Sequence, residues 1–268
     1  MFSIELLQTE LNTKFLGREV KYLDKTNSTN DDAWQYFQNN AVETLVITDN
    51  QQKGKGRRQS RWFSVPKKSL TFSFLLIPKI EFKQLSILPL LTGVSIVKGM
   101  KSVANIQVGL KWPNDIMLTS KKMGGILIET RSCQSELGIV VGIGLNINES
   151  LNDIPKDLTD QTTSLYIYSG ENFRRELILS AILNEFECLY LHHWNGIVSL
   201  WQNHCIHRND RVTFHTDDEL HKGIFQGITD HGHAEILVNG KIETFPSGIV
   251  RLAIRCSALV VKVESLSK

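Results

Sequence analysis

The sequence lacks the features that mark membrane-spanning and exported proteins. None of its apolar clusters reaches the roughly 18 residues of a membrane span, and residues 85–91 are interrupted by serine and proline. The N-terminal segment carries acids and has no basic start before an apolar stretch, so we expect no signal peptide. The cysteines are few and scattered and form no CxxC pair, which argues against a disulfide framework and favours the cytoplasm.

An excess of charge of one sign is also lacking. With 30 basic and 28 acidic residues, the formal net charge is +2, which excludes a globally basic nucleic-acid-binding protein. A local basic patch is nevertheless present, and no acid interrupts it. Its cations are Lys53, Lys55, Arg57, Arg58, Arg61, Lys67 and Lys68.

Apolar residues make up 41% of the chain, enough for a packed core, and their spacing predicts both helices and strands. Helices are expected over residues 4–15, 27–34, 85–103, 173–194 and 197–204. Strands are expected over residues 20–23, 44–48, 70–77, 108–111, 116–118, 126–130 and 138–146. Ser28, Thr29 or Asn30 can cap the second helix, whose first turn holds two aspartates.

The pattern changes near residue 209. Short β-branched stretches alternate there with Asp, Gly and His turns, and Asn239-Gly240 is a strong hairpin signal. Five or so short strands in this segment predict a small barrel. We therefore divide the chain into a larger domain of residues 1–208 and a small C-terminal barrel of residues 209–268.

A glycine-rich basic loop follows the strand predicted at residues 44–48. Its sequence, QQKGKGRRQSRW over residues 51–62, sets two glycines among cations, so that the backbone can approach an anion closely. It matches neither the P-loop pattern GxxxxGK[ST] nor the dinucleotide fingerprint GxGxxG. The alternative is a solvated surface loop that binds nothing.

Three further segments combine glycine or proline with polar residues. KWPND, residues 111–115, brings a lysine, an asparagine and an aspartate to a proline turn, where a cation can face a phosphate. KMGGILIE, residues 122–129, sets a lysine before a glycine pair, and GIGLNIN, residues 142–148, ends a buried strand in asparagines. Each alone is equally compatible with an ordinary turn or a close-packed strand.

Taken in this order, and with Ser28-Thr29-Asn30 upstream, these segments closely resemble the biotin protein ligases. That family shows Ser-Thr-Asn, a GRGRxGRxW loop, KWPND, a lysine before a small-Gly-Ile-Leu strand, and GIGxN. The resemblance covers about residues 20–150. It implies an α+β fold with a mixed sheet and flanking helices, of the class II synthetase-like kind found in biotin and lipoate ligases, followed by an SH3-like barrel.

Two departures from the family pattern matter for the loop. Lys55 stands where the family usually has arginine, which keeps the cation but loses its planar fork. Gln59 stands where it usually has glycine, which stiffens the loop. Because only 27 residues precede Ser28, we also expect no N-terminal helix-turn-helix domain and no repressor activity.

The resemblance implies ATP-dependent activation of biotin to biotinyl-5'-AMP and its transfer to a lysine of a biotin carboxyl carrier protein, an acetyl-CoA carboxylase subunit or a similar biotin-accepting domain. Mg²⁺ is expected with ATP and not in a fixed protein site. The implied protein contacts neither DNA nor membrane, and a homodimer is possible.

The resemblance also assigns residues. Those implied to bind biotin are Ser28, Thr29, Asn30, Gln51, Lys55, Gly56, Arg57 and Lys122. Those implied to bind ATP are Arg57, Arg58, Trp62, Asn114 and Asn146, with Trp62 stacked on adenine. Catalysis is assigned to Arg57, Lys111, Asp115 and Lys122, with Asp115 positioning or deprotonating the carrier lysine.

Other interpretations stay open at this point. Lipoate or octanoate ligases and transferases have a related catalytic domain. The basic patch could serve a nucleic-acid-binding module, although only Trp62 and Phe63 accompany it as stacking aromatics. His204-Cys205-x-His207 suggests a metal, but no third ligand has a recognised spacing, and we expect a solvated helix end instead.

Overall fold

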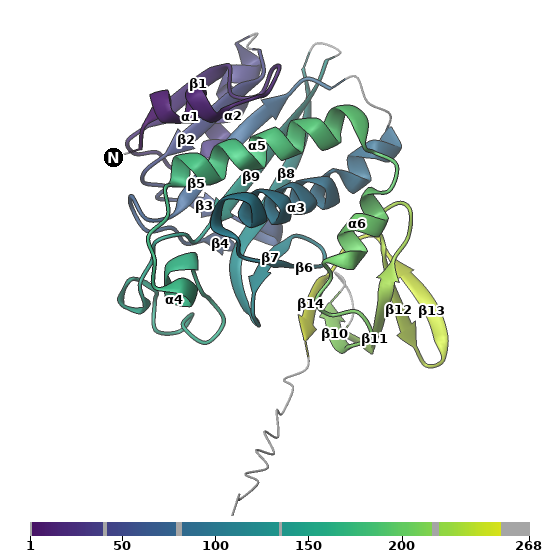
Figure 1. The fold of residues 1–268 in the computed structure, drawn as a ribbon. Coiled ribbons are helices and arrows are strands. Elements are labelled where there is room, and N and C mark those ends of the chain that lie inside the picture. The colour runs from purple at the N-terminus through teal and green to yellow at the C-terminus, as the bar shows by residue number, and fades with distance from the viewer. Residues whose placement is uncertain (1, 40–41, 79–81, 134–135, 216–219, 253–268) are drawn as a thin grey trace, which may run out of the picture.

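The computed structural model describes residues 2–39, 42–78, 82–133, 136–215 and 220–252. A mixed seven-stranded sheet forms the larger part, in the order β1-β2-β5-β9-β8-β7-β6 (Figure 1). Its strands are β1 (Glu19–Leu23), β2 (Thr44–Thr48), β5 (Leu70–Leu76), β6 (Gly109–Lys111), β7 (Asp115–Leu118), β8 (Lys121–Cys133) and β9 (Glu136–Leu145). β1 and β2 are parallel, and each of the other neighbouring pairs is antiparallel.

Helices cover both faces of this sheet. They are α1 (Ile4–Glu10), α2 (Thr29–Gln38), α3 (Phe82–Ala104), α4 (Leu165–Ser169), α5 (Arg175–His192) and α6 (Ile197–Asn203), with a short 3-10 turn at Leu151–Asp153. Side chains alternate between the faces along each strand. Phe72 and Phe74 of β5 belong to the core with α3 and α5, which lie together across one face in Figure 1. Leu75 points the other way, into a smaller core with Trp34 of α2.

The start of α2 follows the prediction. Ser28 is its N-cap and accepts a hydrogen bond from the backbone N–H of Asp31, while Asp31 and Asp32 place negative charge in the first turn, where the helix dipole favours it. The apolar stripe of α2 packs on β2, β5 and β9. The N-terminus of α2 is thereby held over the centre of the sheet.

Helix α3 corrects the expectation that no segment has the length and apolarity of a membrane span. Residues Gln84–Ala104 do have them, and Pro89 lies inside the helix, as in the helix predicted over residues 85–103. Of the 18-residue apolar segment within this stretch, 67% is buried inside the protein, where α3 packs against α5 and α6. The core helices of globular proteins can have the same length and composition, and the burial of α3 identifies it as such a helix.

Several element boundaries differ from the predictions. Helix α1 ends at Glu10, and the chain after it is extended from Leu11. β8 begins at Lys121, five residues before the predicted start, because the KMGG segment pairs with both β7 and β9. The glycines there permit close packing: a Cβ on Gly124 would lie 2.5 Å from the Leu145 side chain. Helix α4 was not predicted.

The small C-terminal sheet has the five antiparallel strands expected, in the order β13-β12-β11-β10-β14. They are β10 (Arg211–His215), β11 (Leu220–Ile228), β12 (Ala234–Val238), β13 (Lys241–Phe245) and β14 (Ile249–Leu252). Residues 253–268 of the predicted barrel lie outside the described residues. Hydrogen bonds join the segment after α6 to β6, from the Leu110 N–H to the His204 carbonyl (2.8 Å) and from the Ile206 N–H to the Leu110 carbonyl (3.1 Å).

Candidate active site

A cavity of about 280 Å³ lies between the N-terminus of α2, the strands β5, β8 and β9, the basic loop and the KWPND turn. Thirteen of the predicted site residues line it: Ser28, Thr29, Asn30, Gln51, Lys55, Gly56, Arg57, Arg58, Trp62, Lys111, Asn114, Asp115 and Lys122. The fourteenth, Asn146, is not among the lining residues. Four segments that are far apart in the sequence therefore meet in one place.

The basic loop forms a small hairpin over this cavity. β3 (Gly54–Lys55) pairs with β4 (Arg61–Trp62), and a 3-10 turn, Arg57–Gln59, lies between them. Arg58 (φ 50°) and Gln59 (φ 60°) adopt the left-handed conformation that glycine tolerates best. The usual glycine of the family pattern would fit the second of these positions, so the departure at Gln59 keeps the turn while introducing backbone strain.

The GIGLN segment serves the site through its glycines. A Cβ on Gly142 would lie 2.0 Å from Oδ1 of Asn30, and a Cβ on Gly144 would lie 2.4 Å from the indole of Trp62. Both glycines lie on the α2 face of β9, in register with β5 and β8. Their missing side chains make room for Asn30 and Trp62 directly over the sheet.

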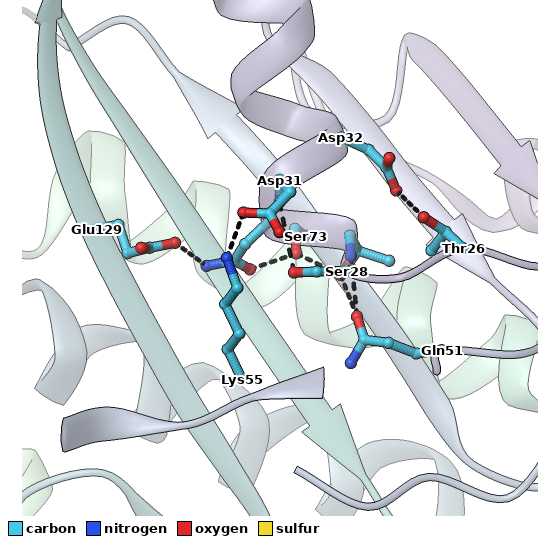
Figure 2. A network of polar contacts seen from close by, with 10 residues as sticks. Thr26, Ser28, Asp31, Asp32, Gln51, Lys55, Ser73 and Glu129 are labelled. Atoms are coloured by element: carbon cyan, nitrogen blue, oxygen red, sulfur yellow. Dashed lines mark hydrogen bonds and ion pairs between the residues drawn. The ribbon is translucent and has the colours of Figure 1, made fainter. Parts of the chain in front are cut away.

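Uncharged polar side chains form one cluster in the cavity wall (Figure 2). Gln51 accepts hydrogen bonds from the backbone N–H of Thr29 (2.9 Å) and lies 3.2 Å from its hydroxyl. The Thr29 hydroxyl lies 2.6 Å from that of Ser73, and Ser73 donates to Asn30. Thr71 also lines the cavity, and its buried hydroxyl has no hydrogen-bond partner among the described residues.

A second cluster is charged. Asp115 is bonded to two lysines, with Lys122 Nζ at 2.5 Å from Oδ1 and Lys111 Nζ at 2.9 Å from Oδ2. Burial alone would raise the pKa of Asp115, but the two ammonium groups outweigh it and hold this pKa below its ordinary value. Asp115 is therefore a permanent carboxylate that fixes the position of both lysines.

Arg57 joins the basic loop to the C-terminal sheet. Its guanidinium donates to the carbonyl of Gly248 at 3.4 Å, and both residues line the cavity. Burial, and after it the neighbouring Arg58, lowers the pKa of Arg57, and the carboxylate of Asp115 offsets this only in part. An anionic ligand would supply further negative charge.

The cavity is strongly cationic. Asp115 is the one acid among the described lining residues, against the six cations Lys55, Arg57, Arg58, Arg61, Lys111 and Lys122. The predicted basic patch is divided, because Lys68 lies outside the lining and pairs with Asp153 at 2.6 Å.

Three predicted residues have structural partners of their own. Lys55 forms an ion pair with Asp31 at 2.6 Å, which ties the loop to α2 (Figure 2). Asn114 donates to the Ile126 carbonyl (2.7 Å) and so fixes the KWPND turn against β8. Asn146 is 6% exposed, lies outside the cavity lining and donates to the Thr163 carbonyl at 3.0 Å.

The histidine–cysteine segment has no metal-site arrangement. Among the residues that the structure describes, no group of three or more His, Cys, Asp or Glu side chains is placed to hold a metal ion. His207 is fully buried and lies 4.1 Å, centroid to centroid, from the ring of Phe225. Burial, and after it Lys111, lowers the pKa of His207 to about 3. The expectation of a solvated helix end was wrong for His207, which is a neutral core residue.

Sequence reasoning missed several residues of the site. Thr71 and Ser73 alternate with Phe72 and Phe74, a period-two pattern that places both hydroxyls on the α2 face and could have identified them. Glu129, the last residue of KMGGILIE, faces the same side and accepts from Asn30 at 2.7 Å. Gly248 and Val250 of the C-terminal segment carried no signal, because they reach the cavity through tertiary packing alone.

Comparison with known proteins places this geometry in a family. Residues 20–146 match the model of the biotin/lipoate A/B protein ligase family. The bifunctional ligase/repressor BirA of Bacillus subtilis is 33% identical over 248 residues, which cover 90% of this chain and 76% of that protein. Biotin–protein ligase 1 of Arabidopsis thaliana is 27% identical, over 87% of this chain and 66% of that protein.

A solved structure agrees in fold. The biotin protein ligase of Aquifex aeolicus in complex with biotin and ATP superposes with a TM-score of 0.75 at 28% identity, over 88% of this chain and 100% of that one. The mixed sheet with flanking helices and the antiparallel C-terminal sheet are thus confirmed as this architecture. The four motifs, their convergence on one cavity and these likenesses together show that the chain belongs to the biotin protein ligase family.

Proposed function

We propose that this protein activates biotin with ATP as biotinyl-5'-AMP and transfers biotin to a lysine of a biotin carboxyl carrier protein. The observation that carries the proposal is the composition of one cavity, in which an uncharged hydrogen-bonding cluster and a cationic cluster share the wall. The first suits a ureido ring, which has both N–H donors and a carbonyl acceptor. The second suits a carboxylate and a phosphate brought together.

In the first step, a carboxylate oxygen of biotin attacks the α-phosphorus of ATP. The new O–P bond forms as the bond to the β-phosphate oxygen breaks, and pyrophosphate leaves. Two anions must approach each other, so Lys122, Lys111 and Arg57 lower the barrier by neutralising the charge between them. Mg²⁺ would accompany the nucleotide, since Asp115 is already shared by two lysines.

In the second step, a neutral lysine amine of the carrier attacks the acyl carbon, AMP leaves, and the nitrogen loses a proton. Asp115 is the candidate for orienting this amine through a hydrogen bond to its carboxylate. The lowered pKa of Asp115 makes it a weak proton acceptor, which favours positioning over deprotonation. Arg57 and the loop hairpin would cover the anhydride until the carrier arrives.

Release of pyrophosphate from ATP, measured with and without biotin, tests the proposal. Biotin should stimulate the release, and lipoic or octanoic acid should not. A dithiolane or an alkyl chain would leave the buried Thr71 hydroxyl and the NH₂ group of Gln51 without a ligand partner, which costs about 1–3 kcal/mol for each buried group. Stimulation by octanoate equal to that by biotin would assign the chain to the lipoate branch of the family.

Transfer is tested with a purified biotin carboxyl carrier domain. Incorporation of labelled biotin should require ATP, the intact carrier and its acceptor lysine. The Lys→Arg carrier at that position is the matched control, because it keeps the charge and the fold of the acceptor. Labelling that persists on the arginine variant would show that the acceptor site is not specific.

A further inference from the structure

A continuous chain of hydrogen bonds runs beneath the uncharged cluster, from β8 through α2 and β5 to the start of the basic loop. Glu129 accepts from Asn30 Nδ2 at 2.7 Å, and Asn30 Oδ1 accepts from the Ser73 hydroxyl at 2.7 Å. The Ser73 and Thr29 hydroxyls lie 2.6 Å apart, and the Thr29 backbone N–H donates to Gln51 Oε1 at 2.9 Å. Figure 2 shows Glu129 and Gln51 at the two ends, with Ser73 between them.

The carboxylate at one end sets the direction of every bond in this chain. Glu129 as a carboxylate can only accept, so Asn30 must turn its NH₂ group toward it and its carbonyl oxygen toward Ser73. Ser73 has a single proton and donates it to Asn30. Toward Thr29, Ser73 can therefore only accept.

Thr29 is left as an acceptor on the cavity side. Its one proton goes to Ser73 at 2.6 Å in preference to Gln51 Oε1 at 3.2 Å. The Thr29 oxygen keeps a lone pair free, and Thr29 is one of the residues that line the cavity. Gln51 uses Oε1 to accept the Thr29 backbone N–H, which leaves its NH₂ group available to donate. The wall thus presents an acceptor beside a donor.

The central residues of this hydrogen-bond chain are buried, so the direction of each hydrogen bond affects ligand binding. Ser73 is fully buried, and Thr29 and Asn30 are 2% and 5% exposed. Gly142 of β9 leaves room for the Asn30 side chain, because a Cβ at that position would lie 2.0 Å from Asn30 Oδ1. Water has little access to compensate a misdirected donor, so the direction of the chain is fixed before a ligand enters.

We propose that Glu129 and Ser73 are positioning residues that hold Thr29 as a hydrogen-bond acceptor, so that the cavity selects a ligand carrying an N–H group next to a carbonyl. The inference rests on the proposed function, since the biotin ureido ring has this arrangement. Ser73 and Glu129 are absent from the lining of the 280 Å³ cavity, although Glu129 lines the adjoining hollow under the basic loop, and they act on this cavity through Asn30 and Thr29. The selection is for the N–H donor and not for ring size.

Glu129→Gln tests the direction of the chain. A carboxamide has the shape of the carboxylate but can also donate, which allows Asn30 to turn over and Thr29 to point its proton into the cavity. Calorimetric titration with biotin, without ATP, should show affinity weakened about tenfold. Titration with the cyclic carbamate analogue, in which oxygen replaces one ring N–H, should show a smaller loss or a gain. The preference for biotin over the carbamate therefore falls.

Two further variants complete the experiment. Glu136→Gln makes the same change on β9 at an exposed position of the same sheet and should leave both affinities unchanged. Ser73→Ala breaks the chain at its middle and should reduce the preference as Glu129→Gln does. In turnover assays, both chain variants should raise the KM for biotin and change kcat by less than about twofold.

The outcomes separate this inference from the proposed function. An unchanged preference in Glu129→Gln and Ser73→Ala, or an equal loss for biotin and carbamate, would overturn the positioning role and leave a structural one. Wild-type protein that binds biotin with the expected preference but releases no pyrophosphate would overturn the proposed reaction alone. Wild-type protein that fails to bind biotin would overturn both.

Discussion

Replacing Lys122 by alanine tests the charge balance of the lysine–aspartate cluster. Lys111 and Lys122 share the single carboxylate of Asp115, so two positive charges and one negative charge leave a net +1. Lys122→Ala makes the cluster neutral. The negative charge that builds up between a carboxylate and an α-phosphate would then lose one of its stabilising cations. The fold should survive, since the Lys122 side chain is 39% exposed.

The magnitude follows from two arguments. Coulomb's law gives about 4 kcal/mol for unit charges at about 4 Å with an effective dielectric constant of about 20. This is an upper figure, because Asp115 lies against the same ammonium group and offsets part of its field. In other enzymes, removing one preorganised donor that stabilises a transition state costs about 3–4 kcal/mol, or about 10²–10³-fold in kcat. We expect a loss of about 100-fold or more.

The assay is biotin-dependent exchange of pyrophosphate into ATP. Lys121→Ala is the matched control, since Lys121 is the neighbouring lysine on β8 and its ammonium donates to the Thr159 carbonyl instead. Circular dichroism and thermal unfolding confirm that both variants are folded. If Lys122→Ala exchanges pyrophosphate within about threefold of the wild type, Lys122 is a surface lysine and the charge argument is wrong.

Four other changes probe the loop, the cavity wall and the core. Arg57→Gly should release the adenylate early, so that an unrelated lysine-rich protein is biotinylated faster than by the wild type at equal pyrophosphate release; an equal rate would show that Arg57 does not retain the intermediate. Thr71→Val should stabilise the unliganded protein by up to about 1 kcal/mol in chemical denaturation, because it removes a buried hydroxyl without a partner, while raising the KM for biotin several-fold; unaltered KM would place Thr71 outside the binding site. Gln59→Gly should relieve about 1 kcal/mol of left-handed strain, so a large loss of stability would reveal a packing role. His207 has a pKa of about 3 in the folded state against its ordinary 6.5, so stability is fully present above pH 6.5 and is lost as pH falls toward 3; His207→Phe should flatten this slope relative to the wild type, and an unchanged slope would exclude His207 as its source.

Parts of the site could be predicted where the interacting residues are close together in the sequence. KWPND places Lys111 four positions before Asp115, and the hairpin of β6 and β7 turns that spacing into an ion pair. The glycines of GIGLN can also be recognised from the local sequence, but their role in the site cannot. Only the fold shows that Gly142 gives way to Asn30, which lies 112 positions earlier in the chain.

Sequence analysis does not reach the features that tertiary packing decides. The helix predicted over residues 85–103 is confirmed with Pro89 inside it, but its packing against α5 could not be predicted. The hydrogen bond from the Asn146 amide to the Thr163 carbonyl joins segments that no motif links. Glu129 ends the KMGGILIE motif, and its hydrogen bond to Asn30 of α2 depends on how β8 and α2 lie over the sheet.

The C-terminal sheet is coupled to the chemistry by two contacts that originate in different motifs. Trp112, from the KWPND turn, donates through its indole N–H to the Gly232 carbonyl at 3.0 Å and is 1% exposed. Arg57, from the basic loop, donates to the Gly248 carbonyl at 3.4 Å. Each carbonyl belongs to a connection between strands of the small sheet, and each donor belongs to a segment of the cavity wall. A displacement of that sheet would therefore move the loop arginine and the lysine-bearing turn together, which makes the small sheet part of the wall that positions both.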